Sequence, residues 1–199
     1  DTDKVVRFAS QIKGITFVYE GQANTTKAHS GGIMIISGTK DTVKFEDVVF
    51  RDGRAQLGGA VLVIVNPGTV EFGPGTVFEK NRAERYGGAL AILSSADVLL
   101  EEASFRNNSA ASGGAIAILP KSEVEFKKDG IDDLDIWRVP EIQLAEWTRS
   151  RLRVENTSFS EDHTHANKIG GFGGAIYMME NDIVMSDSRF TACYTDDFG

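Results

Sequence analysis

Residues 78–90 read Phe-Glu-Lys-Asn-Arg-Ala-Glu-Arg-Tyr-Gly-Gly-Ala-Leu, and residues 105–116 repeat the pattern as Phe-Arg-Asn-Asn-Ser-Ala-Ala-Ser-Gly-Gly-Ala-Ile. Both stretches contain Phe-x-x-Asn, an alanine five residues after the phenylalanine, and a Gly-Gly-Ala triplet before an aliphatic residue. A unit of about 27 residues that recurs in this way indicates a repeat architecture, in which each unit buries its apolar face only against its neighbours.

The pattern extends, with variations, through the whole chain of 199 residues. Glycine pairs stand at 31–32, 58–59, 87–88, 113–114 and 173–174, and each pair follows a phenylalanine: Phe17, Phe50, Phe78, Phe105 and Phe159. Phe190 opens a sixth copy, in which the spacing predicts that Gly199 is the first glycine of a pair. We therefore expect the chain to be a segment of a longer repeat array.

Each repeat contains short runs rich in Val and Ile between Gly, Asn and Asp residues, which is typical of β-strands. Two or three such strands in 27 residues, with no helix, predict one coil of a parallel β-helix, and the leucine–asparagine pattern of a leucine-rich repeat is absent. We expect an all-β solenoid of about five to six coils that forms one unit over residues 1–199. We assign structural roles to the motif residues Phe50, Phe78, Asn81, Gly87, Gly88, Phe105, Asn108, Gly113, Gly114, Phe159, Gly173 and Gly174.

The glycines are expected where φ is positive or where two coils approach closely. Asn81 and Asn108 are expected at a turn, where asparagine tolerates the left-handed conformation and its amide can bond along a ladder.

The strand after each glycine pair has alternating columns across the copies, and period 2 assigns a face to each. Two columns are aliphatic and should fill the core: Met34, Val61, Leu90, Ile116 and Ile176, then Ile36, Val63, Ile92, Ile118 and Met178. The column between them should point outward: Ile35, Leu62, Ala91, Ala117 and Tyr177. A second sheet should bury Val43, Val98, Leu152 and Ile183, and also Phe45, Leu100, Val154 and Met185, with the motif phenylalanines closing the stack.

Phe-x-x-Asn followed by Gly-Gly-Ala-[Ile/Leu/Val] resembles the repeat of the chlamydial polymorphic outer-membrane proteins (Pmp-like repeats), which also occurs in other large surface proteins, including algal ones. The paired motifs here are Phe78–Asn81 with Gly87–Leu90, and Phe105–Asn108 with Gly113–Ile116. The resemblance covers about residues 40–119 and 151–199. It implies a right-handed parallel β-helix in a surface-exposed, often adhesive region.

An insertion of about 27 residues interrupts the repeat within roughly 121–150. Ile142, Ala145 and Trp147 lie at helical spacings after Pro140, so we expect a short helix over 140–149. The insertion contains both tryptophans, Trp137 and Trp147.

The outward column lacks charge, and an exposed apolar sheet face usually marks a contact surface. Two main interpretations are open: the insertion folds back over this face, or the face and the tryptophans bind a partner protein. A third interpretation is that this column simply tolerates small residues. The candidate docking residues are Leu62, Tyr177, Trp137 and Trp147.

Chemical sites are sparse in the sequence. The acidic residues Asp129, Asp132, Asp133 and Asp135 are candidate Ca²⁺ ligands, although the spacing of a helix–loop–helix calcium site is absent. His163 and His165, beside Asp162, are a candidate pair of transition-metal ligands, but no further ligand lies nearby in the sequence. A polysaccharide-cleaving β-helix needs convergent carboxylates, and the outward residues Glu46, Glu101 and Glu155 would meet that need only if the coils align suitably. We expect no cofactor and no enzyme activity.

Three Asn-x-Ser/Thr sequences are candidate glycosylation sites: Asn24, Asn107 and Asn156. A net charge of −8 argues against a nucleic-acid partner, and no apolar run is long enough for a membrane-spanning helix. We expect a structural or interaction module of a surface or secreted protein, or of an organelle lumen, with protein partners and candidate glycan contacts. The alternatives are an accessory scaffold subunit that docks on a larger membrane-associated assembly, and a polysaccharide lyase or hydrolase.

Overall fold

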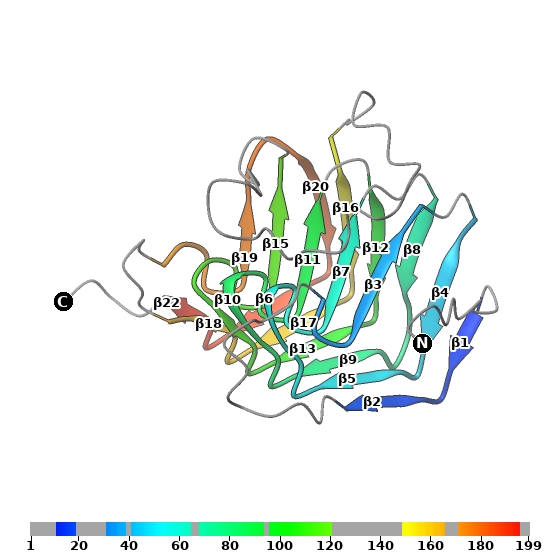
Figure 1. The fold of residues 1–199 in the computed structure, drawn as a ribbon, viewed down its shortest axis with the longest axis horizontal. Helices are drawn as coiled ribbons and strands as arrows, with labels where there is room; N and C mark the ends of the chain where they lie inside the picture. Colours follow the sequence, from blue (N-terminus) through cyan, green and yellow to red (C-terminus); the bar gives the residue numbers. More distant parts are fainter. Residues whose placement is uncertain are drawn as a thin grey trace, which may run out of the picture.

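The computed structural model describes residues 11–18, 31–38, 41–64, 68–93, 96–120, 149–165 and 171–195, and every regular element in them is a β-strand. The strands form four parallel sheets that run along one stack of coils (Figure 1). A parallel β-helix is therefore confirmed. The predicted helix over 140–149 falls almost entirely outside the described residues.

Sheets 1 and 2, named in their order along a coil, each contain six strands. Sheet 1 consists of β1 (Gln11–Lys13), β4 (Val43–Glu46), β8 (Thr69–Phe72), β12 (Asp97–Glu101), β16 (Arg151–Glu155) and β20 (Asp182–Ser186). Sheet 2 consists of β2 (Thr16–Val18), β5 (Val49–Arg51), β9 (Val77–Glu79), β13 (Ser104–Arg106), β17 (Ser158–Ser160) and β21 (Arg189–Thr191).

Sheets 3 and 4 each contain five strands. Sheet 3 consists of β6 (Arg54–Leu57), β10 (Arg82–Tyr86), β14 (Ser109–Ala110), β18 (His163–Thr164) and β22 (Tyr194–Thr195). Sheet 4 consists of β3 (Met34–Ser37), β7 (Val61–Ile64), β11 (Leu90–Leu93), β15 (Ile116–Leu119) and β19 (Ile176–Met178). Coils 2 to 5 contribute a strand to every sheet, and the described residues of coils 1 (β1–β3) and 6 (β20–β22) contribute three each. A complete coil thus has four strands, where the sequence predicted two or three.

The corners between sheets use the left-handed backbone conformation. Between sheets 2 and 3 the residue just before Asn81 or Asn108 has a positive φ: Lys80 at 55° and Asn107 at 52°. The prediction that Asn81 and Asn108 themselves adopt this conformation is therefore wrong by one residue. Between sheets 3 and 4 the first glycine of each pair has a positive φ, for example 65° at Gly87, as predicted.

The second glycine of each pair allows close contact between coils. A Cβ atom on Gly88 would meet the carbonyl oxygen of Gly114 in the next coil, and would lie 2.6 Å from the backbone nitrogen of Ser109. Both neighbours are backbone atoms, which cannot rotate away. A side chain at this position would push the coils apart.

The predicted core columns are buried in the central coils, whereas their last members, Met178 and Met185, are 38% and 41% exposed. The strand register places Leu90 between Val61 and Ile116, and Val98 next to Leu152, with all five side chains fully buried. Val70 and Phe72 are the members of the sheet 1 columns in coil 3, and neither was predicted from the sequence.

The motif phenylalanines form one continuous column inside sheet 2. Successive rings are stacked, with centroids 4.6–5.3 Å apart, from Phe17 through Phe50, Phe78, Phe105 and Phe159 to Phe190. The insertion does not break the column, since the rings of Phe105 and Phe159 stack at 4.9 Å although 54 residues separate them. The coil is therefore the unit of packing, whatever the length of chain between coils.

Candidate functional site

A ladder of buried polar groups runs through the corner between sheets 2 and 3, at the third residue after each motif phenylalanine. Oδ1 of Asn81 accepts a hydrogen bond from the backbone N–H of Gly53 at 2.9 Å, and Oδ1 of Asn108 accepts one from the N–H of Asn81 at 3.0 Å. The Nδ2 groups donate to the carbonyl oxygens of Phe50 and Phe78, both at 3.0 Å. Because both asparagines are almost completely buried, the ladder satisfies polar groups that would otherwise lose hydration. The predicted ladder is confirmed.

Asp162 occupies the ladder position of coil 5. Its Oδ1 accepts from the backbone N–H of Asn108 at 2.9 Å and from Nδ2 of Asn108 at 2.8 Å. Its Oδ2 is buried and has no hydrogen-bond partner in the described part of the chain. Burial raises the pKa of Asp162 to about 7, and the hydrogen bonds from Asn108 only partly oppose this. The carboxyl group replaces an amide that could have donated a hydrogen bond to the preceding coil.

Cys193 occupies the same position in coil 6, three residues after Phe190. Its Sγ lies 3.6 Å from the carbonyl oxygen of Thr191. Burial raises the pKa of the thiol, while a hydrogen bond from the backbone of Asp162 lowers it. Cys193 was not predicted as a ladder residue, although its spacing of three residues from Phe190 matches that of Asn81 from Phe78.

The outward column of sheet 4 points away from the main core, as predicted, but its central members are not exposed. Leu62, Ala91 and Ala117 are fully buried in a second apolar cluster, together with Leu57 and Leu119. The chain itself excludes solvent from them. Burial at these positions agrees with the interpretation in which the face is covered and is contrary to Leu62 as an exposed docking residue, whereas Ile35 at the start of the column is 42% exposed.

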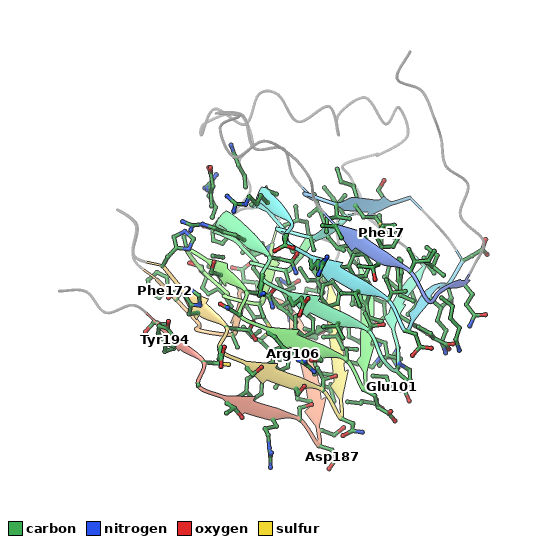
Figure 2. All side chains as sticks on the ribbon, turned by 90° about the horizontal axis from the view of Figure 1, so that it is seen from below. Phe17, Glu101, Arg106, Phe172, Asp187 and Tyr194 are labelled. Carbon is green, nitrogen blue, oxygen red and sulfur yellow. The ribbon has the colours of Figure 1, made fainter. Side chains whose placement is uncertain are left out.

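Tyr177, the other described docking candidate, lies at the margin of this second cluster and is partly buried. Its ring stacks on Tyr86 with centroids 6.0 Å apart, and on Phe172 at 6.1 Å. Phe172 is half exposed (Figure 2). Trp137 and Trp147 lie outside the described residues.

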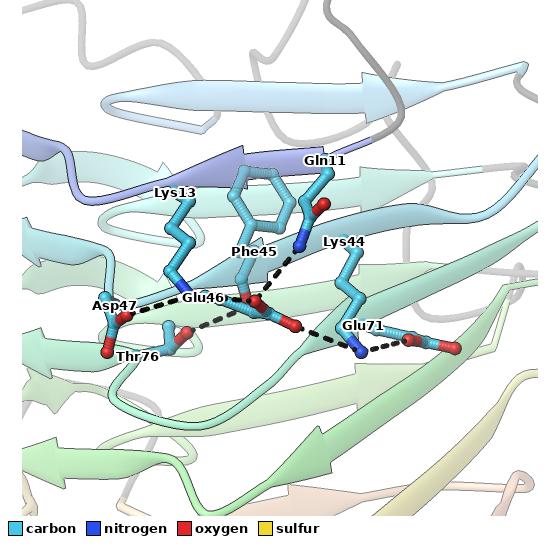
Figure 3. A network of polar contacts seen from close by, with 8 residues as sticks. All are labelled: Gln11, Lys13, Lys44, Phe45, Glu46, Asp47, Glu71 and Thr76. Carbon is cyan, nitrogen blue, oxygen red and sulfur yellow. Dashed lines mark hydrogen bonds and ion pairs between the residues drawn. The ribbon is translucent and has the colours of Figure 1, made fainter.

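The outer face of sheet 1 is charged, and its first coils form an ion-pair network (Figure 3). Nζ of Lys44 lies 3.2 Å from Glu46 and 3.6 Å from Glu71, and Nζ of Lys13 lies 3.4 Å from Glu46 and 3.5 Å from Asp47. The hydrogen bond from Lys44 is the largest cause that lowers the pKa of Glu46. These partners are solvent-accessible, so the network contributes little to stability.

The same face brings two of the candidate catalytic carboxylates together. Glu101 pairs in register with Glu155 of the next coil. The two side chains therefore stand side by side on adjacent strands, and these strands are about 4.8 Å apart. Gly73 separates Glu46 from this pair, because the register of β4 and β8 places it beside Glu46. The alignment that the sequence left open thus exists for Glu101 and Glu155.

The remaining candidate residues do not converge. Asp162 points into the ladder, whereas the ring of His163 stacks on Tyr194 at 5.2 Å. Within the described ranges, no three His, Cys, Asp or Glu side chains are grouped to hold a metal ion. The candidate calcium ligands Asp129, Asp132, Asp133 and Asp135, like Asn24, lie outside the described residues. Asn107 and Asn156 are exposed at corners with positive φ.

No family model, curated protein or solved structure matches this chain. Among the described elements, no helix has the length and apolar character needed to cross a membrane.

Proposed function

We propose that this chain is a non-catalytic structural and interaction module: a rigid β-helical segment of a surface or secreted protein that mediates adhesion or protein docking. The phenylalanine column is the observation that carries this proposal. It runs without a break from Phe17 to Phe190, and the buried amide ladder runs parallel to it. The repeated residues thus hold one coil on the next, while the outer faces differ from coil to coil.

Rigidity follows from this arrangement. In coils 2 to 5 every motif phenylalanine is fully buried between two other rings, and close packing of this kind resists bending. Such a stack holds its loops and faces at fixed distances from one another, which is what a spacer or a docking platform requires.

Distance measurements between spin labels test the rigidity. Ile15→Cys and Tyr194→Cys in a Cys193→Ser background would place labels on exposed residues of coils 1 and 6. We expect one narrow distance distribution that does not change between 0.05 and about 1 M salt, because the stack depends on apolar packing rather than on screened charges. A broad or salt-dependent distribution would exclude a rigid module.

A second candidate, polysaccharide cleavage, is favoured by one observation, the pairing of Glu101 with Glu155. Their strands lie about 4.8 Å apart, and retaining glycosidases use two carboxyl groups about 5 Å apart. The pair lies on an open sheet face, which offers no means of excluding water from a reacting bond. We therefore expect no turnover of uronate polymers with or without Ca²⁺. Cleavage that Glu101→Gln abolishes would overturn the non-catalytic assignment.

A further inference from the structure

We propose that the outer face of sheet 3 binds an acidic glycan, and that Arg54 and Arg82 together hold one of its sulfate or carboxylate groups. This inference rests on the proposed adhesion function and assigns it a surface and a class of ligand. We call this surface the arginine row. It consists of the outward residues that pair in register through coils 2 to 5: Arg54, Arg82, Ser109 and His163.

The two arginines of the row stand side by side on neighbouring strands. Arg54 of β6 pairs with Arg82 of β10, and both side chains are exposed, whereas Ala55 and Ala83 after them are buried. The strands are about 4.8 Å apart, so the two guanidinium groups can converge on one anion. Neither arginine forms an ion pair with any residue of the described ranges. Like charges in this position repel each other, and an anion held between them would remove the repulsion.

Charged neighbours elsewhere in the stack have opposite signs in six register pairs: Lys13–Glu46, Lys44–Glu71, Arg51–Glu79, Glu79–Arg106, Asp97–Arg151 and Arg151–Asp182. Glu101 and Glu155 form the other like-charged pair among the described strands, but a cation lies near it. The hydrogen bond with Glu46 is the largest cause that raises the pKa of Lys44, and the charge of Glu101 raises this pKa further. The arginine pair, which has no acidic side chain within ion-pair distance in the described ranges, is therefore the exception in the stack.

The arginine row continues into a shallow polar notch. Ser109 lies between Arg82 and His163, and it is only 8% exposed although its position is an outward one. Its side chain is much shorter than those on either side, so the row dips there. The ring of His163 is held at the far side of the notch, because its Nδ1 lies 3.2 Å from the carbonyl oxygen of Glu161. A hydroxylated sugar ring matches this notch when its acidic group lies at the arginine pair.

The spacing of the row favours a glycan over an acidic peptide. The row advances by about 4.8 Å per coil, which is close to the advance of an extended glycan chain by one sugar. Side chains on one side of an extended peptide recur only every second residue, at intervals of about 6.7 Å. A peptide would therefore lose register with the row within two coils.

The charge around the row favours a ligand with few acidic groups. Exposed Glu84 lies on β10, two residues after Arg82, and Asp52 and Glu161 lie at the corners beside the row. Asp52 is already 3.8 Å from Arg51. These carboxylates and the net charge of −8 repel a nucleic acid, which has one phosphate per about 1.7 Å of duplex, more strongly than a glycan with one acidic group per sugar.

Binding of fluorescently labelled oligosaccharides to the intact chain, measured by fluorescence polarisation at low salt, tests the proposal. A heparin-derived hexasaccharide supplies sulfate and carboxylate groups, a galacturonate hexamer supplies carboxylates alone, and a glucose hexamer is uncharged. We expect saturable binding of the two acidic probes that weakens as salt is added, and no binding of the glucose hexamer.

Substitutions in the arginine row separate specific binding from general attraction of anions. Arg82→Ala and, independently, Arg54→Ala should weaken binding of the acidic probes about tenfold, because each removes charge-assisted hydrogen bonds. Arg82→Lys should recover only part of the affinity, because an ammonium group lacks the planar fork of donors. Arg106→Ala is the matched control: it removes the same charge from an exposed residue, but Arg106 pairs with Glu79 on sheet 2, so binding should be nearly unchanged.

Stability distinguishes a binding role of the arginines from a structural one. Arg54→Ala and Arg82→Ala should leave the urea midpoint of the free chain unchanged or slightly raised, because each relieves the repulsion within the pair. A clearly lower midpoint in both variants would assign the arginines to the fold and contradict the proposal.

Three binding results would also overturn the proposal. They are no saturable binding of either acidic probe, equal weakening by Arg82→Ala and Arg106→Ala, or tighter binding of a hexaglutamate peptide or a single-stranded hexanucleotide than of the acidic sugars. The last result would assign the row to an acidic protein or to a nucleic acid. None of these results changes the spin-label distances, so a failure of this inference is distinguishable from a failure of the rigid module.

Discussion

Phe159 and Phe190 occupy the same position in consecutive coils, and their rings stack 4.6 Å apart, but solvent reaches only Phe190. The opposite end of the stack differs, because the core residues Ile12 and Ile36 of coil 1 are 7% and 8% exposed. The comparison teaches that the repeat motif specifies how coils stack, whereas the position of a coil in the stack decides how much each motif residue stabilises the fold.

The largest expected effect comes from the phenylalanine column. Phe105→Ala removes a ring that is fully buried between two others, and should lower the free energy of unfolding by about 3–5 kcal/mol, measured by urea denaturation. Phe190→Ala should cost less than half as much, because solvent already reaches one side of the ring. Equal losses would show that the central and terminal coils do not differ.

The ladder provides a prediction about pH. Asp162 has a pKa of about 7 in the folded chain, whereas an unperturbed aspartate has a pKa of about 3.9, so the folded state binds more protons than the unfolded state between these pH values. Stability should therefore fall as pH rises from about 4 to 7 and then stay level. Asp162→Asn should remove this loss and stabilise the protein at pH 8 by on the order of 2–4 kcal/mol.

The new amide in Asp162→Asn should donate to the carbonyl oxygen of Phe105, as Asn108 does to that of Phe78. Thermal denaturation from pH 4 to pH 8 measures the effect. Asp187→Asn is the control, because Asp187 is an exposed corner residue of coil 6 and should leave the pH profile unchanged. An Asp162→Asn profile that falls as steeply as that of the unmodified chain would contradict the account of the ladder.

Two glycines differ in the space around them: Gly88 lies at a close contact between coils, and Gly73 lies at an open corner. Gly88→Ala should destabilise by about 1–3 kcal/mol, because its Cβ would meet backbone atoms of coil 4. Gly73→Ala should be nearly neutral, because the nearest atom to its Cβ, the carbonyl oxygen of Phe45, lies 3.4 Å away. Urea midpoints measure both, and similar losses would mean that the glycine pairs do not set the spacing of the coils.

The smallest effect is expected on the outer face of sheet 1. Glu101→Gln relieves repulsion from Glu155 and should stabilise by a few tenths of a kcal/mol at low salt, with less effect at high salt. Glu155→Gln should have the same effect, and combining the two should add little. A loss of stability from either substitution would show that the pair makes a favourable contact.

The sequence predicted the fold because the packing repeats. The spacing of Phe78, Asn81 and Gly87 is imposed by one coil of fixed circumference, so the same residue types return at the same places. The register of columns such as Leu90 and Ile116 follows directly from this. The four corners were harder to predict, because residues such as Lys80 and Asn107 adopt a positive φ without being glycine.

Features that do not repeat were predicted less well. Burial of Leu62 and Ala91 depends on what lies outside the coil, which no column of the repeat encodes. The pairing of Glu101 with Glu155 depends on how the chain resumes after the insertion, and alignment of the motifs left it open. The exposure of Phe190 is a property of its place in the stack, because its motif is the same as that of Phe159.

Residue-level hydrogen exchange under native conditions tests the central claim most directly. Amides in β8 to β13 should exchange slowest and together, through global unfolding, because coils cover both of their sides. Amides in β20, β21 and β22 should exchange at least about a hundredfold faster through local opening of the terminal coil. Equal protection in β13 and β21 would contradict the claim that the position of a coil in the stack decides how much its residues stabilise the fold.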